Sequence, residues 1–179
     1  MTSALESLEK SYAAGLADPE WMSQDSDLDK LIWSVPEIIA HLSRLYRLEP
    51  GPESAHSLAR LFIVGNDLGR AEFYLKEALG GNGVDAKTRA QWYYELALVT
   101  NALGNYCEAI ANAREAISLN GNSGQAYMLL GDAMIASRKS LGDEFQKRTA
   151  YWAAADMYEK AASVDPSLED EASKKLSKS

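Results

Sequence analysis

Apolar side chains recur at spacings of three and four residues in several stretches of this chain, and that spacing is typical of amphipathic helices. Two such stretches, residues 4–16 and 34–48, lie before Pro50. Ser34 is placed to cap the second helix, and Pro50 begins a Pro-Gly-Pro run that ends it. The pattern predicts helices rather than strands, because β-branched residues are scattered and do not alternate with polar ones.

A longer repeat begins at Pro52. Within residues 90–123, a first helix ends at a turn predicted at Gly104-Asn105, and an alanine-rich second helix follows. The residues of the first helix recur 38 positions earlier and 34 positions later, and each recurrence is followed by a matching second helix. The matching first-helix positions are Ala55, Leu58, Ala59 and Phe62; Tyr93, Leu96, Ala97 and Thr100; and Tyr127, Leu130, Gly131 and Met134. The matching second-helix positions are Ala71, Leu75 and Ala78; Ala109, Ala113 and Ala116; and Ala154, Tyr158 and Ala161.

The third pair of helices carries about eleven additional residues between its two helices. Gly142 and Asp143 have the character of a turn and a helix cap, and the sequence after them is continuously helical in composition. We therefore predict a loop at 137–142 and a second helix that is longer by about two turns at its N-terminal end. Ser167 and Asp170 form a capping-box-like pair, which predicts the start of a last helix.

This pattern resembles the tetratricopeptide repeat, in which an aromatic residue, a Leu and a small residue precede an alanine-rich second helix. The segment YMLLGDAM at 127–134 is the best match, and the part from Tyr151 onwards resembles the closing repeat of bacterial proteins of this type. The resemblance implies an all-α fold, a right-handed α-solenoid of antiparallel helix hairpins. It divides the chain into degenerate or capping helices at 1–50, repeats at about 52–85, 90–123 and 124–167 with an insert near 137–149, and a C-terminal capping helix at 168–179.

Small residues at three matching positions indicate where the two helices of each hairpin approach closely. Ala59, Ala97 and Gly131 occupy these positions, and each follows a leucine that is expected to fill the space beside it. A larger side chain there would force the helices apart.

The resemblance also implies a concave groove lined by the first helices, in which a peptide or partner protein binds. Placing the buried positions inward leaves an opposite face on these helices. Its residues are Glu53, His56, Arg60, Val64, Gln91, Tyr94, Leu98, Asn101, Gln125, Met128, Asp132 and Ile135. Two interpretations follow: an open groove with an apolar centre and a polar entrance at His56 and Arg60, or a face covered by the terminal segments of the chain itself.

The formal net charge is −8, which disfavours nucleic acid and anionic membrane surfaces as partners. A chaperone-tail carboxylate is disfavoured as well, because Glu95 would repel it. No stretch approaches 18 consecutive apolar residues, and the N-terminus lacks the features of a signal peptide. A cytoplasmic location without membrane insertion is therefore expected, unless Met1 replaces a removed leader.

Few residues are candidates for a catalytic, metal-binding or phosphate-binding site. His41 and His56 have no cysteine or histidine at a metal-binding spacing, and Cys107 is the single cysteine. The glycine cluster at 80–83 is better explained as a loop between repeats than as a phosphate-binding loop. Of the four tryptophans, Trp21 lies in an acidic stretch and is the one suspected of contacting a partner. We predict no catalytic residue, no metal site and no cofactor.

Taken together, the sequence predicts a soluble, non-catalytic scaffold or adaptor that binds a protein partner. The alternative is a self-assembly module that forms homo-oligomers through exposed apolar helices.

Overall fold

The computed structural model describes residues 38–40, 42–44, 46–138 and 142–177. The chain divides into two compact units, Met1–His41 and Leu42–Ser179, and the following description concerns the second. The predicted helix at 4–16, the tryptophans at 21 and 33, and His41 lie outside the described residues. The part of the predicted 34–48 helix that is described is helical, and Tyr46 packs edge-on against Tyr74 with ring centroids 5.5 Å apart.

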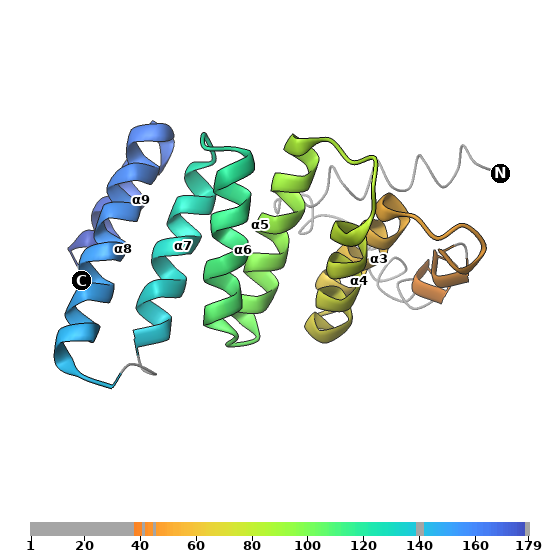
Figure 1. Cartoon of the computed structure of the whole chain (residues 1–179), viewed down its shortest axis with the longest axis horizontal. Helices are drawn as coiled ribbons and strands as arrows, with labels where there is room; N and C mark the ends of the chain where they lie inside the picture. The colour runs from red at the N-terminus through yellow and green to blue at the C-terminus, as the bar shows by residue number, and fades with distance from the viewer. Residues whose placement is uncertain (1–37, 41, 45, 139–141, 178–179) are drawn as a thin grey trace, which may run out of the picture. The chain divides into compact units, whose positions relative to one another are not determined.

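Helices α3 to α8 form three antiparallel pairs that stand side by side in Figure 1. Each first helix packs on the helix that follows it, and each second helix packs on the next first helix. The described residues contain no strand. The pairs are α3 (Pro52–Val64) with α4 (Leu68–Gly80), α5 (Ala86–Ala102) with α6 (Tyr106–Leu119), and α7 (Gly124–Ser137) with α8 (Glu144–Val164). A short 3₁₀-helix η3 (Pro166–Leu168) and α9 (Glu169–Leu176) follow.

The turns between helices use the residues that the sequence indicated. Gly104 joins α5 to α6 with φ of 82°, a left-handed conformation that glycine adopts without strain. Asn66 takes a similar conformation between α3 and α4, with φ of 56°. The Asp143 side chain accepts a hydrogen bond of 2.7 Å from the backbone N–H of Gln146, which confirms the predicted cap of α8.

Helix α8 is longer than the other second helices, as predicted: it has 21 residues, against 13 in α4 and 14 in α6. The last helix begins within a residue of its predicted start, at Glu169 after a turn of 3₁₀-helix, but Ser167 does not cap it. Ser167 donates its hydroxyl to Asp165 at 2.6 Å. Asp165 also accepts a hydrogen bond from the backbone N–H of Ser167 and so caps the 3₁₀-helix.

The core lies between the paired helices and is built largely of alanine and leucine. The small residues predicted at the close approaches are buried, with Ala59 and Ala97 fully enclosed. At the third position the ring of Tyr158 lies beside Gly131, where a Cβ atom would come within 2.5 Å of Cε1. Small side chains therefore set the distance between the helices of each pair, because anything larger would overlap the neighbour.

Candidate functional site

The residues predicted to line a groove lie on α3, α5 and α7, and we call the side of these helices that carries them the inner face. Their exposure varies along it. Glu53, Val64, Gln91, Leu98 and Gln125 are exposed; His56, Arg60, Tyr94, Asn101, Asp132 and Ile135 are half-buried; Met128 is buried. Polar contacts join residues of this face to other helices: His56 links α3 to α5, and Asp132 links α7 to α8 and α9.

The α3–α5 contact is a hydrogen-bonded pair between His56 and Glu95. The His56 Nε2 and Glu95 Oε2 atoms are 2.6 Å apart, and because a carboxylate accepts, Nε2 carries the proton. Both side chains are largely enclosed, with 15% and 17% of their surface exposed. The imidazole also stacks on the indole of Trp92, with ring centroids 4.8 Å apart. These contacts fix both rings and the carboxylate in one arrangement.

Two opposing effects set the pKa of Glu95. Burial raises the pKa, but the hydrogen bond and charge of His56, the hydrogen bond from Gln91 and the charge of Arg60 together outweigh burial. The pKa therefore lies below its ordinary value of 4.5, and Glu95 is ionised at neutral pH. The α3–α5 part of the inner face thus carries a fixed negative charge.

The apolar part of the inner face is centred on α5. Leu98 is 41% exposed, and Tyr94, one turn earlier, packs against a cluster that includes Ala97, Leu129 and Leu130. Burial raises the pKa of the Tyr94 hydroxyl above its ordinary value, and the negative charges of Glu95 and Glu171 raise it further. Glu171 belongs to α9, so carboxylates from both sides act on this tyrosine.

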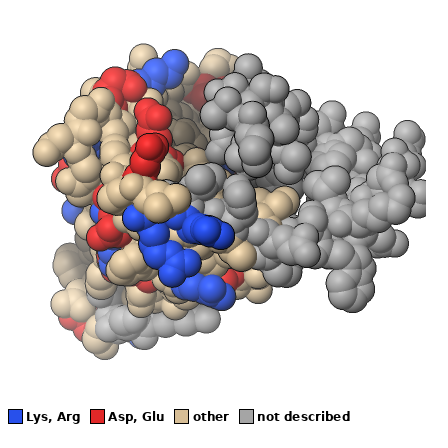
Figure 2. Space-filling model, turned by 90° about the vertical axis from the view of Figure 1, so that its right-hand side faces the viewer, with Lys and Arg blue, Asp and Glu red and all other residues tan. Residues whose placement is uncertain are grey.

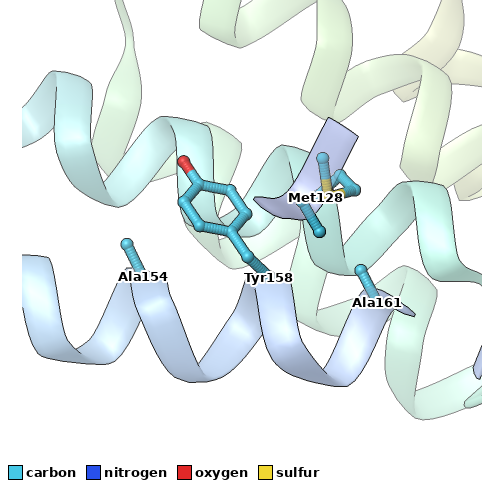
Figure 3. Packing of buried hydrophobic residues seen from close by; sticks show 5 residues of the cluster. Met128, Ala154, Tyr158 and Ala161 are labelled. Atoms are coloured by element: carbon cyan, nitrogen blue, oxygen red, sulfur yellow. The ribbon is translucent and has the colours of Figure 1, made fainter. Parts of the chain in front are cut away.

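The α7 part of the inner face is partly covered by the chain itself. Met128 was predicted to be exposed, but it is only 5% exposed and packs in a cluster with Ala154, Tyr158, Ala161 and Ala172; four of these side chains are labelled in Figure 3. The expectation for Met128 was wrong for a physical reason: α9 supplies Ala172 and closes over it. Gln125, on the same helix, remains exposed.

Asp132 takes part in the same closure. Its carboxylate accepts hydrogen bonds from the Tyr158 hydroxyl at 2.9 Å and from the Lys175 ammonium at 2.6 Å. Lys175 also forms an ion pair with Glu171, at 3.6 Å. Burial raises the pKa of Tyr158, and the hydrogen bond and charge of Asp132 raise it further, so the hydroxyl remains a donor. Asp132 therefore ties α7 to both α8 and α9.

A pocket of about 400 Å³ opens near the first turn of α5, beside the turn between α6 and α7. Its lining is more polar than apolar and includes Lys87, Gln91, Tyr94, Asn120 and Ser123. Within the described part of the chain, no three His, Cys, Asp or Glu side chains form a group that could hold a metal ion. Two of its lining residues, Gln91 and Tyr94, belong to the inner face.

Charges of both signs share the molecular surface. Figure 2 shows a group of Lys and Arg side chains beside a band of Asp and Glu side chains at one end of the molecule. Ion pairs among the described residues include Lys76 with Glu72 and with Glu108, at 2.6 and 2.7 Å. Among the described helices, none has the length and apolar character needed to cross a membrane.

Comparisons with known proteins identify the fold. No family model matches the sequence, and no curated protein matches it. A crystal structure of MamA is similar, with 21% identity, a TM-score of 0.62, and coverage of 87% of this chain and 92% of that one. The TPR domain of Arabidopsis OM64 is similar with 22% identity and a TM-score of 0.57, over 72% of this chain and 95% of that domain. A MamA fragment from Desulfovibrio magneticus RS-1 has 18% identity and a TM-score of 0.59, over 74% and 67% of the two chains.

These likenesses define the class of fold. The chain has the fold of a tetratricopeptide-type helical solenoid, as the sequence predicted. The identities are too low to transfer a partner or an activity.

Sequence reasoning missed two residues that organise the inner face. Glu95 was considered only as a repelling charge, and Lys175 was given no role. A signal for the first was present: Glu95 follows His56 by 39 residues, one more than the repeat offset. Positions one repeat apart on first helices lie side by side, so this spacing brings the two side chains together. No comparable regularity links Asp132 to Lys175, 43 residues later.

Proposed function

We propose that this chain is a non-catalytic protein-interaction module whose inner face, at α3 and α5, binds an apolar partner segment that carries Lys or Arg. The observation that carries the proposal is Leu98. This leucine exposes 41% of its surface beside the ordered His56–Glu95 pair. Together with Tyr94, half-buried one turn earlier on α5, it forms an apolar surface rimmed by polar groups, an arrangement typical of a protein-binding surface.

The binding surface is smaller than the sequence suggested. Because Met128 is enclosed and Asp132 is held by Lys175, the α7 third offers little to a partner. The proposed contacts are therefore Leu98 and Tyr94 in the centre, with the polar side chains of Glu53, Gln91 and Glu95 around them. A partner segment would place its apolar side chains on Leu98 and Tyr94.

Charge favours a basic partner over an acidic one. Glu53 is exposed at the start of α3, Glu95 is ionised within the inner face, and Glu171 acts on Tyr94 from α9. Arg60 is one opposing positive charge, and it lies close enough to Glu95 to lower the pKa of that carboxyl. Lys175 is the other, paired with Asp132 and Glu171. Four carboxylates, at Glu53, Glu95, Asp132 and Glu171, against these two cations leave an excess of negative charge, which attracts Lys and Arg side chains and repels a terminal carboxylate.

Selection from a phage-displayed library of random peptides tests the partner chemistry. We expect the bound peptides to be enriched in apolar residues together with Lys or Arg. Selection of acidic peptides would contradict the proposal. Selection on the Leu98→Ser variant provides the comparison, because loss of the apolar side chain without a change of charge should abolish the enrichment in apolar residues.

A variant at Leu103 is the matched control. Leu103 follows α5 and is 40% exposed, almost the same as Leu98, but it was not assigned to the inner face. Leu103→Ser should select the same peptides as the unaltered protein. If both variants lose the enrichment equally, the binding surface does not lie on the inner face.

A further inference from the structure

Two aromatic side chains stand exposed on the lengthened part of α8. Phe145 is 73% exposed and Trp152 is 65% exposed. They are seven residues apart, which places them on the same side of the helix, two turns from one another. The buried side of α8, carried by Ala154, Tyr158 and Ala161, lies opposite. The aromatic side chains therefore point away from the α7–α8 pair and contribute nothing to its core.

Charged residues flank Trp152 in a regular order. At intervals of four residues along α8 stand Glu144, Arg148, Trp152, Asp156 and Lys160, and all five are exposed. Residues four apart form one ridge of a helix surface. The signs along this ridge are negative, positive, aromatic, negative and positive. If the direction of the ridge is reversed about Trp152, each charged residue takes the place of a residue with the opposite charge.

We propose that α8 docks on α8 of a second copy of this chain, antiparallel, about a two-fold axis that passes beside Trp152. In that arrangement Arg148 of each copy lies beside Asp156 of the other, and the two Trp152 indoles contact one another. A two-fold interface is self-complementary, so the Arg148–Asp156 contact occurs twice. Glu144 and Lys160 form the outer pair, although Glu144 also pairs with Lys147 within its own helix at 2.8 Å.

The order of charges selects this arrangement over others. A parallel pairing in register would place each charged residue beside the same residue of the second chain. Like charges would then be in contact, which is unfavourable. Packing of the four-residue ridges of two helices is the commonest way in which helices cross, and it keeps the two ridges alongside one another. The ridge from Arg148 to Asp156 spans about 12 Å, close to the width of a helix, so the whole stretch fits within one crossing.

The area of one helix crossing sets the expected affinity. Such a contact is smaller than the roughly 1,200–2,000 Å² of stable interfaces, so we expect a dissociation constant in the micromolar range. The inner face lies on other helices and takes no part. This self-association is therefore independent of the proposed partner binding, and either can fail without the other.

Sedimentation velocity of the full chain between about 5 and 500 µM provides the first test. We expect a reversible monomer–dimer equilibrium, weakened at least tenfold by Trp152→Ala. Phe73→Ala is the matched control, since Phe73 is 58% exposed but lies on α4, and it should leave the dissociation constant unchanged within twofold. A monomer at every concentration, or an equal effect of both variants, would overturn the proposal.

Charge exchange provides the sharper test. Arg148→Glu alone and Asp156→Arg alone should each dimerise at least tenfold more weakly, because each places like charges together twice. A mixture of the two variants should form a mixed dimer, since both of its contacts then join opposite charges. One contact is between the two introduced side chains, and the other is the original Arg148–Asp156 contact.

The variant that carries both substitutions should dimerise again, because its two contacts again join opposite charges. Far-ultraviolet circular dichroism checks that each variant is folded. Failure of the folded single variants to recover association on mixing would refute the antiparallel pairing.

Discussion

The ring of Tyr158 occupies the place where a side chain at residue 131 would stand. A Cβ atom on Gly131 would lie 2.5 Å from Cε1 of the ring and 2.9 Å from Cζ, closer than such atoms approach in proteins. The ring cannot easily move aside, because it is buried and its hydroxyl donates a hydrogen bond to Asp132. The glycine is therefore what lets α7 and α8 pack at this distance.

Substitution of Gly131 should destabilise the protein in proportion to the size of the new side chain. We expect Gly131→Leu to lower the free energy of unfolding by about 1–3 kcal/mol through overpacking. Gly131→Ala should give a smaller loss, because the better helix propensity of alanine offsets about 1 kcal/mol. Thermal or urea denaturation measures both effects.

Gly69 offers the matched control, since it lies within α4 and a Cβ there would meet no atom within 4 Å. Gly69→Ala should raise the free energy of unfolding by up to about 1 kcal/mol. If Gly131→Leu melts at the temperature of the unaltered protein, the packing of α7 on α8 described above is wrong.

The His56–Glu95 pair should make stability depend on pH on the acid side. The folded pKa of Glu95 lies below the ordinary value of 4.5 that it recovers on unfolding. The contribution of ionised Glu95 to the free energy of unfolding is therefore complete above about pH 4.5, and it is lost as the pH falls through the folded pKa. We expect Glu95→Gln to cost on the order of 1 kcal/mol at pH 7, a difference that shrinks as the pH falls below about 4.5.

Urea denaturation at a series of pH values measures this difference. Glu115→Gln serves as the control, because Glu115 is exposed on α6 and its substitution should leave the pH profile unaltered. A difference between Glu95→Gln and the unaltered protein that stays constant from neutral pH down to about pH 3 would exclude a contribution of the ionised pair.

Lys175 should hold α9 against the inner face without contributing much to global stability. Its ammonium is bonded to Asp132, but both side chains are partly exposed, at 28% and 37%, so the pair is worth at most about 1 kcal/mol. We expect Lys175→Met to speed hydrogen exchange of the α9 amides several-fold while leaving α5 and α6 unaffected. Lys174→Met alters the neighbouring exposed lysine and should have no such effect. Equal exchange in both variants would show that the Asp132–Lys175 contact does not hold α9.

Much of the fold was predictable because it follows from repetition. Three matching sets of leucine and small residues placed the close approaches at Ala59, Ala97 and Gly131, and the structure buries them. The lengthened α8 was predictable too, since inserted residues with helical composition and an aspartate cap leave few alternatives. Periodicity and capping are local properties, and local properties can be read from a sequence.

The state of the inner face was less predictable, because it depends on contacts between distant segments. Helical periodicity placed Met128 on the side opposite the buried positions, but it could not say that α9 would cover that side. The paired charges at Asp132 and Lys175 have no common period, so only the folded chain brings them together. The His56–Glu95 pair could have been predicted more readily from the sequence, because its spacing nearly equals one repeat.

The affinity of one selected basic peptide for three forms of the protein tests the central claim most directly. Isothermal titration calorimetry would compare the unaltered protein with Leu98→Ser and Leu103→Ser, whose original leucines are exposed to nearly the same extent. We predict that Leu98→Ser weakens binding at least tenfold and that Leu103→Ser changes it less than twofold. Equal affinity of all three forms, or an equal loss in both variants, would contradict binding at the inner face.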